Sequence, residues 1–103
     1  MGKVLHSLAT ATANGEVLNT RAFTDVTFQI SGTFVATVTF EGTLDGSNWI
    51  AFRATNLNSG TAATTAAAAG LYTATIGGLT SVRAGISLYT SGSVTVLVAG
   101  WSR

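Results

Sequence analysis

The chain of 103 residues contains no cysteine and no proline, and only 9% of its residues are charged. The absence of cysteine excludes disulfide bonds, thiolate metal ligands and a cysteine nucleophile. Charged residues make up about a quarter of an average domain, and the net charge here is only +1, with no run of either sign. Binding to nucleic acid or to an anionic membrane surface depends on clustered positive charge, so neither partner is expected.

Long apolar runs are also lacking. No stretch approaches the roughly 18 to 20 apolar residues of a membrane span, and the N-terminal residues 1–8 lack the apolar core of a secretion signal. Synthesis in a cytoplasm without a signal peptide is therefore expected. Apolar residues nevertheless reach 47% of the chain, which excludes a disordered composition. The length suits one hydrophobic core, so we predict a single domain over residues 1–103, with residues 1–9 as an N-terminal arm or edge strand.

Alternation of apolar and polar residues is the main structural signal, because a period of two indicates a strand with one buried face. The clearest alternation covers residues 34–41, 26–30, 82–89 and 94–98, and weaker examples cover 4–9, 17–19, 48–54 and 71–76. Turns rich in Gly, Asn, Asp and Ser separate these segments. The pattern predicts an all-β fold, an antiparallel and jelly-roll-like β-sandwich of about eight short strands.

Two local features carry expectations of their own. Residues 82–88 and 94–98 flank the short turn Thr90–Ser93, which predicts a β-hairpin. The alanine-rich segment Ala62–Ala69 has high helix propensity. However, it is short, contains two threonines and is bracketed by Gly60 and Gly70, so an extended loop or edge strand is preferred to a helix.

Catalytic residues are scarce. His6 is the single histidine, and no acid lies at a spacing that would make it a general base, so we interpret it as a surface or interface residue. Asp25 and Glu41 could approach each other across neighbouring strands as an acid pair, but solvated strand ends explain both and are favoured. Within the turn 43–48, Asp45 suits a weak calcium site or a simple Asp–Gly turn, which we prefer. No catalytic residue, metal or cofactor is predicted.

Aromatic and arginine side chains offer the best candidates for binding. Such groups can stack on a sugar ring or pack against a neighbouring subunit. Trp49 directly follows a turn, where tryptophan is more often a core residue. Tyr89 and Trp101 lie opposite the apolar faces of their strands. The candidate interface or ligand contacts are Trp49, Arg53, Tyr72, Arg83, Tyr89 and Trp101.

A family resemblance begins at residues 40–49, Phe-Glu-Gly-Thr-Leu-Asp-Gly-Ser-Asn-Trp, and continues through residues 79–89 and a closing segment at 93–99. This order of segments resembles small structural proteins of tailed phages and covers residues 34–100, while the N-terminal third has no part in it. The resemblance implies a virion surface component, such as a capsid decoration or fibre-associated protein, that acts as a multimer. It implies no catalytic residues.

These observations favour a non-enzymatic phage virion structural protein, most concretely a capsid decoration protein on the particle surface. Its expected partners are copies of itself, with a trimer favoured, and a major capsid or other virion protein. The alternative is a carbohydrate-binding or receptor-binding module of a tail or fibre, with a host glycan as partner. A small hydrolase is the least favoured reading, because no catalytic constellation is visible.

Overall fold

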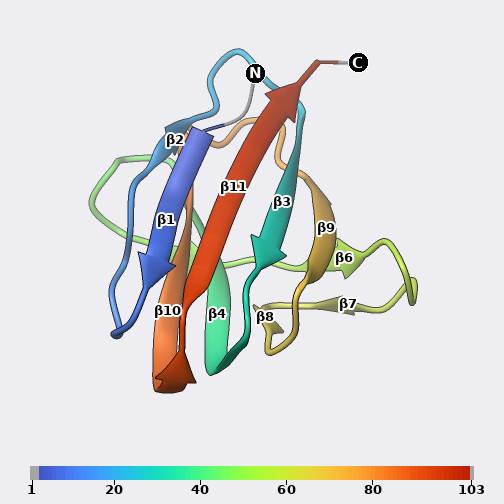
Figure 1. The fold of residues 1–103 in the computed structure, drawn as a ribbon. Coiled ribbons are helices and arrows are strands. Elements are labelled where there is room, and N and C mark those ends of the chain that lie inside the picture. The colour runs from blue at the N-terminus through green and yellow to red at the C-terminus, as the bar shows by residue number, and fades with distance from the viewer. Residues whose placement is uncertain (1–2, 103) are drawn as a thin grey trace.

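The structure, a computed structural model, describes residues 3–102 and consists of two antiparallel sheets packed face to face (Figure 1). The first sheet has the order β1 (Lys3–Ala9), β11 (Val94–Trp101), β3 (Asp25–Ser31), β9 (Gly70–Thr75), β6 (Ala54–Asn56) and β7 (Ala62–Ala63). The second has the order β2 (Leu18–Asn19), β10 (Ser81–Gly92), β4 (Phe34–Thr43) and β5 (Ile50–Ala51), and β8 (Thr65–Ala66) also pairs with β4. The predicted antiparallel β-sandwich is confirmed. No helix within residues 3–102 is long and apolar enough to cross a membrane.

The core forms where the apolar faces of the two sheets meet. Phe28 of β3 and Phe40 of β4 are fully buried, and their ring centroids lie 5.0 Å apart. Tyr72 of β9 joins them, with its ring 5.5 Å from that of Phe40. Removing such a buried aromatic side chain typically costs about 3–5 kcal/mol. Most of the alternating residues identified in the sequence therefore supply the interior from both sheets. Leu88, expected on the buried face with Ile86, is instead 66% exposed, because the register of β10 shifts between these two residues.

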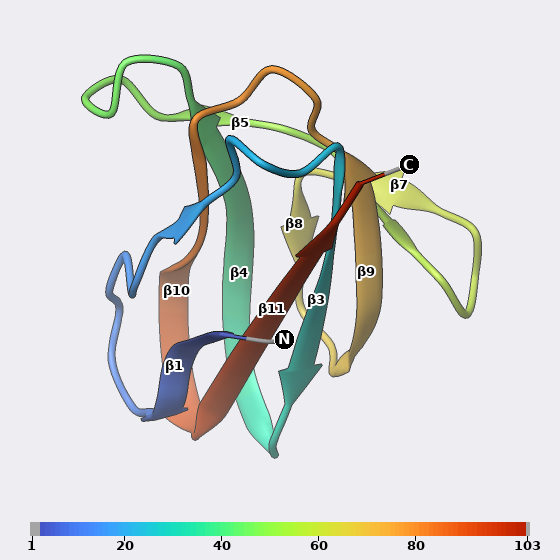
Figure 2. The same cartoon turned by 90° about the horizontal axis from the view of Figure 1, so that it is seen from above.

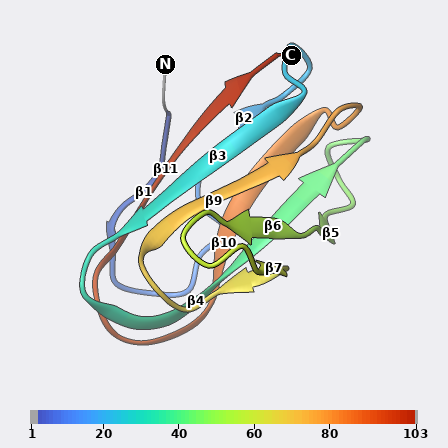
Figure 3. The same cartoon turned by 90° about the vertical axis from the view of Figure 1, so that its right-hand side faces the viewer.

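The expected hairpin of residues 82–88 and 94–98 is wrong. Strand β10 pairs with β2 and β4, whereas β11 pairs with β1 and β3 in the other sheet. Figures 2 and 3 show that the chain turns from one sheet to the other between β10 and β11, as it does between β3 and β4. The apolar faces of β10 and β11 therefore meet across the interior, and the two strands are not hydrogen-bonded neighbours in one sheet. Alternating residues and a short turn are compatible with either arrangement.

Glycines make these two corners possible. Gly32 and Gly92 have φ angles of 113° and 88°, which residues with a side chain rarely adopt. A Cβ atom on Gly92 would overlap the carbonyl oxygen of Thr33. The corners are also bonded to each other, because the amide of Ser93 donates to the Thr33 carbonyl at 3.0 Å.

The alanine-rich segment 62–69 is extended, as preferred from the sequence. Ala63 in β7 pairs with Ala54 of the first sheet, and Ala66 in β8 pairs with Val38 of the second. The segment therefore crosses from one sheet to the other and closes that side of the sandwich. Small side chains suit this crossing, because Ala66 is buried against the core. The strand predicted at 48–54 is instead divided between β5 and β6, which raises the number of strands above the expected eight.

The opposite side of the sandwich is closed by β1 and the irregular segment 10–17. β1 is the edge strand of the first sheet, and Met1 and Gly2 of the predicted arm lie outside the described residues. The register of β1 shifts on either side of His6. Segment 10–17 then contacts the second sheet, where Ala13 forms a bridge with Ile86 of β10.

Candidate functional site

Three side chains from different elements meet on the outer face of the second sheet. Arg83 of β10 lies opposite Glu41 of β4, and its Nε donates to Oε1 of Glu41 at 3.0 Å. The guanidinium carbon of Arg83 also lies 4.3 Å from the ring centroid of Trp49, which comes from the loop between β4 and β5. Partly exposed ion pairs and cation–π contacts each contribute about 1 kcal/mol or less. We call these three residues the Arg83 cluster.

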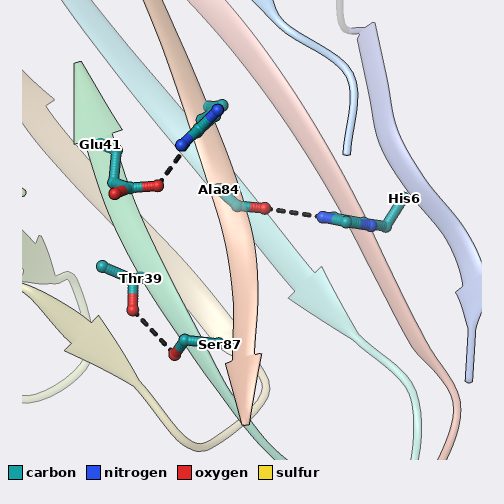
Figure 4. A network of polar contacts seen from close by, with 6 residues as sticks. His6, Thr39, Glu41, Ala84 and Ser87 are labelled. Atoms are coloured by element: carbon teal, nitrogen blue, oxygen red, sulfur yellow. Dashed lines mark hydrogen bonds and ion pairs between the residues drawn. The ribbon is translucent and has the colours of Figure 1, made fainter. Parts of the chain in front are cut away.

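Beyond the Arg83 cluster, the nearest outward positions of β10 and β4 carry small or hydroxyl-bearing residues, and the exposed apolar Leu88 follows opposite Thr37. Gly85 follows on β10, and a Cβ atom placed there would lie 3.5 Å from Glu41 Oε1 and 3.7 Å from Asn14 Oδ1. One step further, the hydroxyl groups of Thr39 and Ser87 form a hydrogen bond of 2.9 Å across the two strands. Figure 4 shows this pair below Glu41 on the β4–β10 ribbon. The surface is ordered by cross-strand contacts, which favours use as a contact face.

The turn 43–48 is organised around one carboxylate. Asp45 Oδ1 accepts hydrogen bonds from the amides of Ser47 and Asn48, both at 2.8 Å, and from Thr43 Oγ1 at 3.0 Å. Its Oδ2 accepts from Nδ2 of Asn48 at 2.7 Å. The amide of Asn48, followed by that of Ser47, holds the pKa of Asp45 well below its usual range. These contacts show that Asp45 shapes the turn. Within residues 3–102, no group of three acidic or histidine side chains is placed to hold a metal ion.

An apolar cleft of about 410 Å³ opens beside this turn, at one end of the sandwich. Its lining includes Phe52, Leu79 and the bare backbone of Gly42. Leu44 and Ile50 flank it and are 69% and 70% exposed. Large apolar side chains that stand in solvent around a hollow are typical of interaction sites. The sequence reasoning did not single out these two residues, although an apolar residue within an otherwise polar turn was a visible signal for Leu44.

The six candidate contact residues do not converge. The structure brings together only Trp49, which is half-buried, and Arg83. Tyr72 is 5% exposed inside the sandwich, where its hydroxyl donates to the Ala68 carbonyl and burial raises the pKa of its phenol. The remaining three, Tyr89 on β10, Trp101 at the end of β11 and Arg53 between β5 and β6, occupy separate elements. The expectation that Tyr89 lies opposite the apolar face is wrong, because the register shift in β10 packs it against the core beside Ala36.

The interpretations of Asp25 and His6 need correction. Asp25 and Glu41 lie in different sheets, so they do not form a cross-strand pair. Asp25 is not a solvated strand end, because it is 3% exposed and accepts hydrogen bonds from the hydroxyl groups of Thr24 and Thr75. His6 is not a surface residue either: it is 6% exposed, and its Nε2 lies 2.7 Å from the Ala84 carbonyl oxygen (Figure 4).

The comparisons with known proteins point to one family. A family model described as XepA matches residues 1–99, while no curated protein sequence matches the chain. The solved structure of the SPBc2 prophage-derived protein YomS is 23% identical with a TM-score of 0.88, and the match covers 95% of this chain and 88% of YomS. The PBSX exported protein XepA is 19% identical with a TM-score of 0.90 over 95% of this chain. This chain spans only 36% of the XepA chain. At such identities the two structures show a shared fold.

Proposed function

The chain belongs to the XepA family, which is associated with phages, and from this membership we propose that it is a non-enzymatic phage structural protein that acts by assembling with other subunits. The observation that carries the proposal is an uncharged face on the outside of the first sheet. The outer face of an antiparallel sheet normally meets water and carries polar or charged side chains. Here two successive rows of residues, each running across neighbouring strands of the sheet, contain no charged side chain.

The first row consists of residues that pair directly across four strands: Val4 of β1, Leu97 of β11, Gln29 of β3 and Leu71 of β9. Val4 and Leu71 are 48% and 45% exposed, and a shallow hollow of about 230 Å³ lies between Leu71 and Leu97. The second row consists of Ala99, Thr27, Thr73 and Thr55. A broad apolar and threonine-rich face favours contact with another protein surface of the same character.

The more specific form of the proposal is a capsid decoration protein on the virion surface, with the face of the first sheet packed against a second copy or against a capsid protein. A closed oligomer, with a trimer favoured, would bury one such face on every subunit. Low overall charge supports this arrangement, because few charged groups would have to be desolvated. The description of XepA as an exported protein is compatible with a location outside the producing cell.

Solution mass tests the assembly proposal. Light scattering after size exclusion, over a series of concentrations, is expected to give a multimer for the unmodified protein. Leu71→Lys, which places a charge in the row, is expected to give a smaller species. Leu88→Lys is the matched control, because Leu88 is 66% exposed but lies on β10 in the second sheet. A strict monomer that also fails to co-sediment with phage particles would refute the proposal.

The Arg83 cluster supports a second candidate, a carbohydrate-binding or receptor-binding module for a host glycan. Trp49 is a half-buried ring held in place by a guanidinium group, and rigid aromatic rings of this kind serve as stacking surfaces for sugars. The scatter of the other aromatic residues makes this candidate weaker. It predicts saturable glycan binding that Trp49→Ala abolishes and Trp101→Ala leaves unchanged. Equal binding by wild type and Trp49→Ala would exclude this ring as the site.

A further inference from the structure

Asn14 and Gly15 form the one Asn–Gly pair of the sequence, and the structure leaves it open to reaction. Both residues are exposed in the irregular segment between β1 and β2, and Gly15 has a φ angle of 75°. Among the described residues 3–102, no hydrogen bond engages the Asn14 side chain or the Gly15 amide. We propose that Asn14 is a site of spontaneous deamidation and isomerisation, and that the product loosens the segment that holds β1 against the second sheet.

The chemistry needs only water. The main-chain nitrogen of Gly15 attacks Cγ of the Asn14 side chain, and the amide nitrogen leaves as ammonia with the proton that the Gly15 nitrogen loses. A five-membered succinimide ring remains, and one water molecule then opens it at either carbonyl. The products are aspartate and isoaspartate, in which the main chain runs through the former side chain and is one methylene longer. Glycine favours the first step, because no side chain shields its nitrogen.

Asp45 and Gly46 provide a comparison within the same chain. An Asp–Gly pair can close the same ring, but here both reacting groups are occupied. The Asp45 carboxylate accepts hydrogen bonds from Thr43, Ser47 and Asn48, and the Gly46 amide donates to Thr43 Oγ1 at 3.0 Å. Ring closure at Asp45 therefore requires hydrogen bonds of the reacting groups to break first, whereas the Asn14 side chain and the Gly15 amide have none to break within residues 3–102.

The position of Asn14 gives its modification a structural effect. On one side, Ala13 exchanges two main-chain hydrogen bonds with Ile86 of β10, at 3.2 and 2.8 Å. On the other, the amide of Glu16 donates to the Leu5 carbonyl of β1 at 3.1 Å. An added methylene between these anchors changes the spacing that both require. Isoaspartate at position 14 is therefore expected to break at least one of them, which frees the edge of β1 or of β10.

Deamidation also adds charge beside the Arg83 cluster. Asn14 Oδ1 and Glu41 Oε1 both lie within 4 Å of the point that a Cβ atom on Gly85 would occupy. Conversion of the amide to a carboxylate places a second negative group near Glu41. The two carboxylates repel each other and both attract the Arg83 guanidinium. Aspartate alone is thus expected to disturb the cluster, even where the main chain keeps its length.

The reaction is tested by ageing the purified full-length protein at mildly alkaline pH, once folded and once in urea. Peptide mass mapping with enzymatic methyl labelling of isoaspartate measures conversion at Asn14 and Asp45. Asn58, which is followed by serine rather than glycine, is measured as a third position. Asn14 is expected to convert at about the same rate in both states, and Asp45 about tenfold more slowly in the folded protein than in urea. Protection of Asn14 in the folded protein, or equal conversion at all three residues, would overturn the assignment.

The structural effect is tested by hydrogen exchange of the Ile86 and Glu16 amides before and after ageing. At least one of the two is expected to exchange about tenfold faster in the isoaspartate form, while the Thr80 amide, bonded to Thr43 elsewhere, stays unchanged. Asn14→Gln, which closes the ring poorly, is the control that ages without change. Asn14→Asp adds the charge without the methylene and is expected to leave both amides protected. Unchanged exchange at both amides in fully converted protein would refute the loosening.

Discussion

Replacement of His6 is predicted to destabilise the fold, because this side chain fills a gap in the hydrogen bonding of β10. Val82 pairs with Leu18 and Ile86 pairs with Ala13, so the intervening Ala84 carbonyl faces the segment that bulges away between them. Nε2 of His6 reaches that oxygen at 2.7 Å. A carbonyl oxygen only accepts hydrogen bonds, so Nε2 must carry a proton. His6 thereby links the edge strand of the first sheet to the second.

The size of the effect follows from two losses. A buried carbonyl without a donor costs about 1–3 kcal/mol, and the space left by a truncated buried side chain adds further cost. For His6→Ala we expect about 3 kcal/mol in the free energy of unfolding, out of the roughly 5–15 kcal/mol available to a small domain. His6→Leu keeps most of the volume without the donor, and about 1–3 kcal/mol is expected.

Urea denaturation, followed by tryptophan fluorescence, measures these differences as shifts in the midpoint at constant slope. His6→Gln is the matched control, because its side-chain amide can donate to the Ala84 carbonyl, and it is expected to retain more stability than His6→Leu. If His6→Leu were as stable as the wild-type protein, the hydrogen bond would contribute nothing and the explanation of this residue would be wrong.

Three further predictions concern the backbone and one carboxylate. Leu8 is 67% exposed and has a φ angle of 50°, a left-handed conformation that costs about 1–2 kcal/mol. Asparagine tolerates this conformation better, so Leu8→Asn is expected to raise the melting temperature. A lower melting temperature would contradict the strain. Gly92→Ala is expected to destabilise the protein more than Gly46→Ala. Both glycines have a positive φ, but only at Gly92 would the added Cβ atom overlap the Thr33 carbonyl oxygen. Equal urea midpoints for the two variants would contradict the close packing of Gly92 against Thr33. The lowered pKa of Asp45 implies stability that is present above the unfolded pKa of about 3.9 and lost as pH falls toward the folded pKa. The free energies of unfolding of the wild-type protein and of Asp45→Asn, measured over a series of acidic pH values, should therefore converge at low pH. A constant difference between the two proteins at every pH would contradict the prediction.

Much of the fold was predictable because strand formation is a local matter. In β3, β4, β11 and the first half of β10 the apolar residues recur every second position, and these strands appear close to their expected bounds, as does β9 with its weaker alternation. The extended state of segment 62–69 was also predictable, since a short stretch flanked by glycines cannot sustain a helix. The site was less predictable. The six candidate contacts were chosen by residue type, and only Trp49 and Arg83 meet.

The sequence by itself determined the fold class, the absence of disulfides and the main strands, because these depend on composition and on periodicity along the chain. Only the tertiary structure decided which strands are neighbours. A short turn such as Thr90–Ser93 can form either a hairpin within one sheet or a corner between two sheets. Here the Gly92 backbone packs against Thr33 and stabilises the corner. The tertiary structure likewise decided the roles of His6, whose partner is 78 residues away along the chain, and of Asp25, which Thr75 reaches from 50 residues away. Such contacts depend on register across the sheets, which alternation within one strand does not encode.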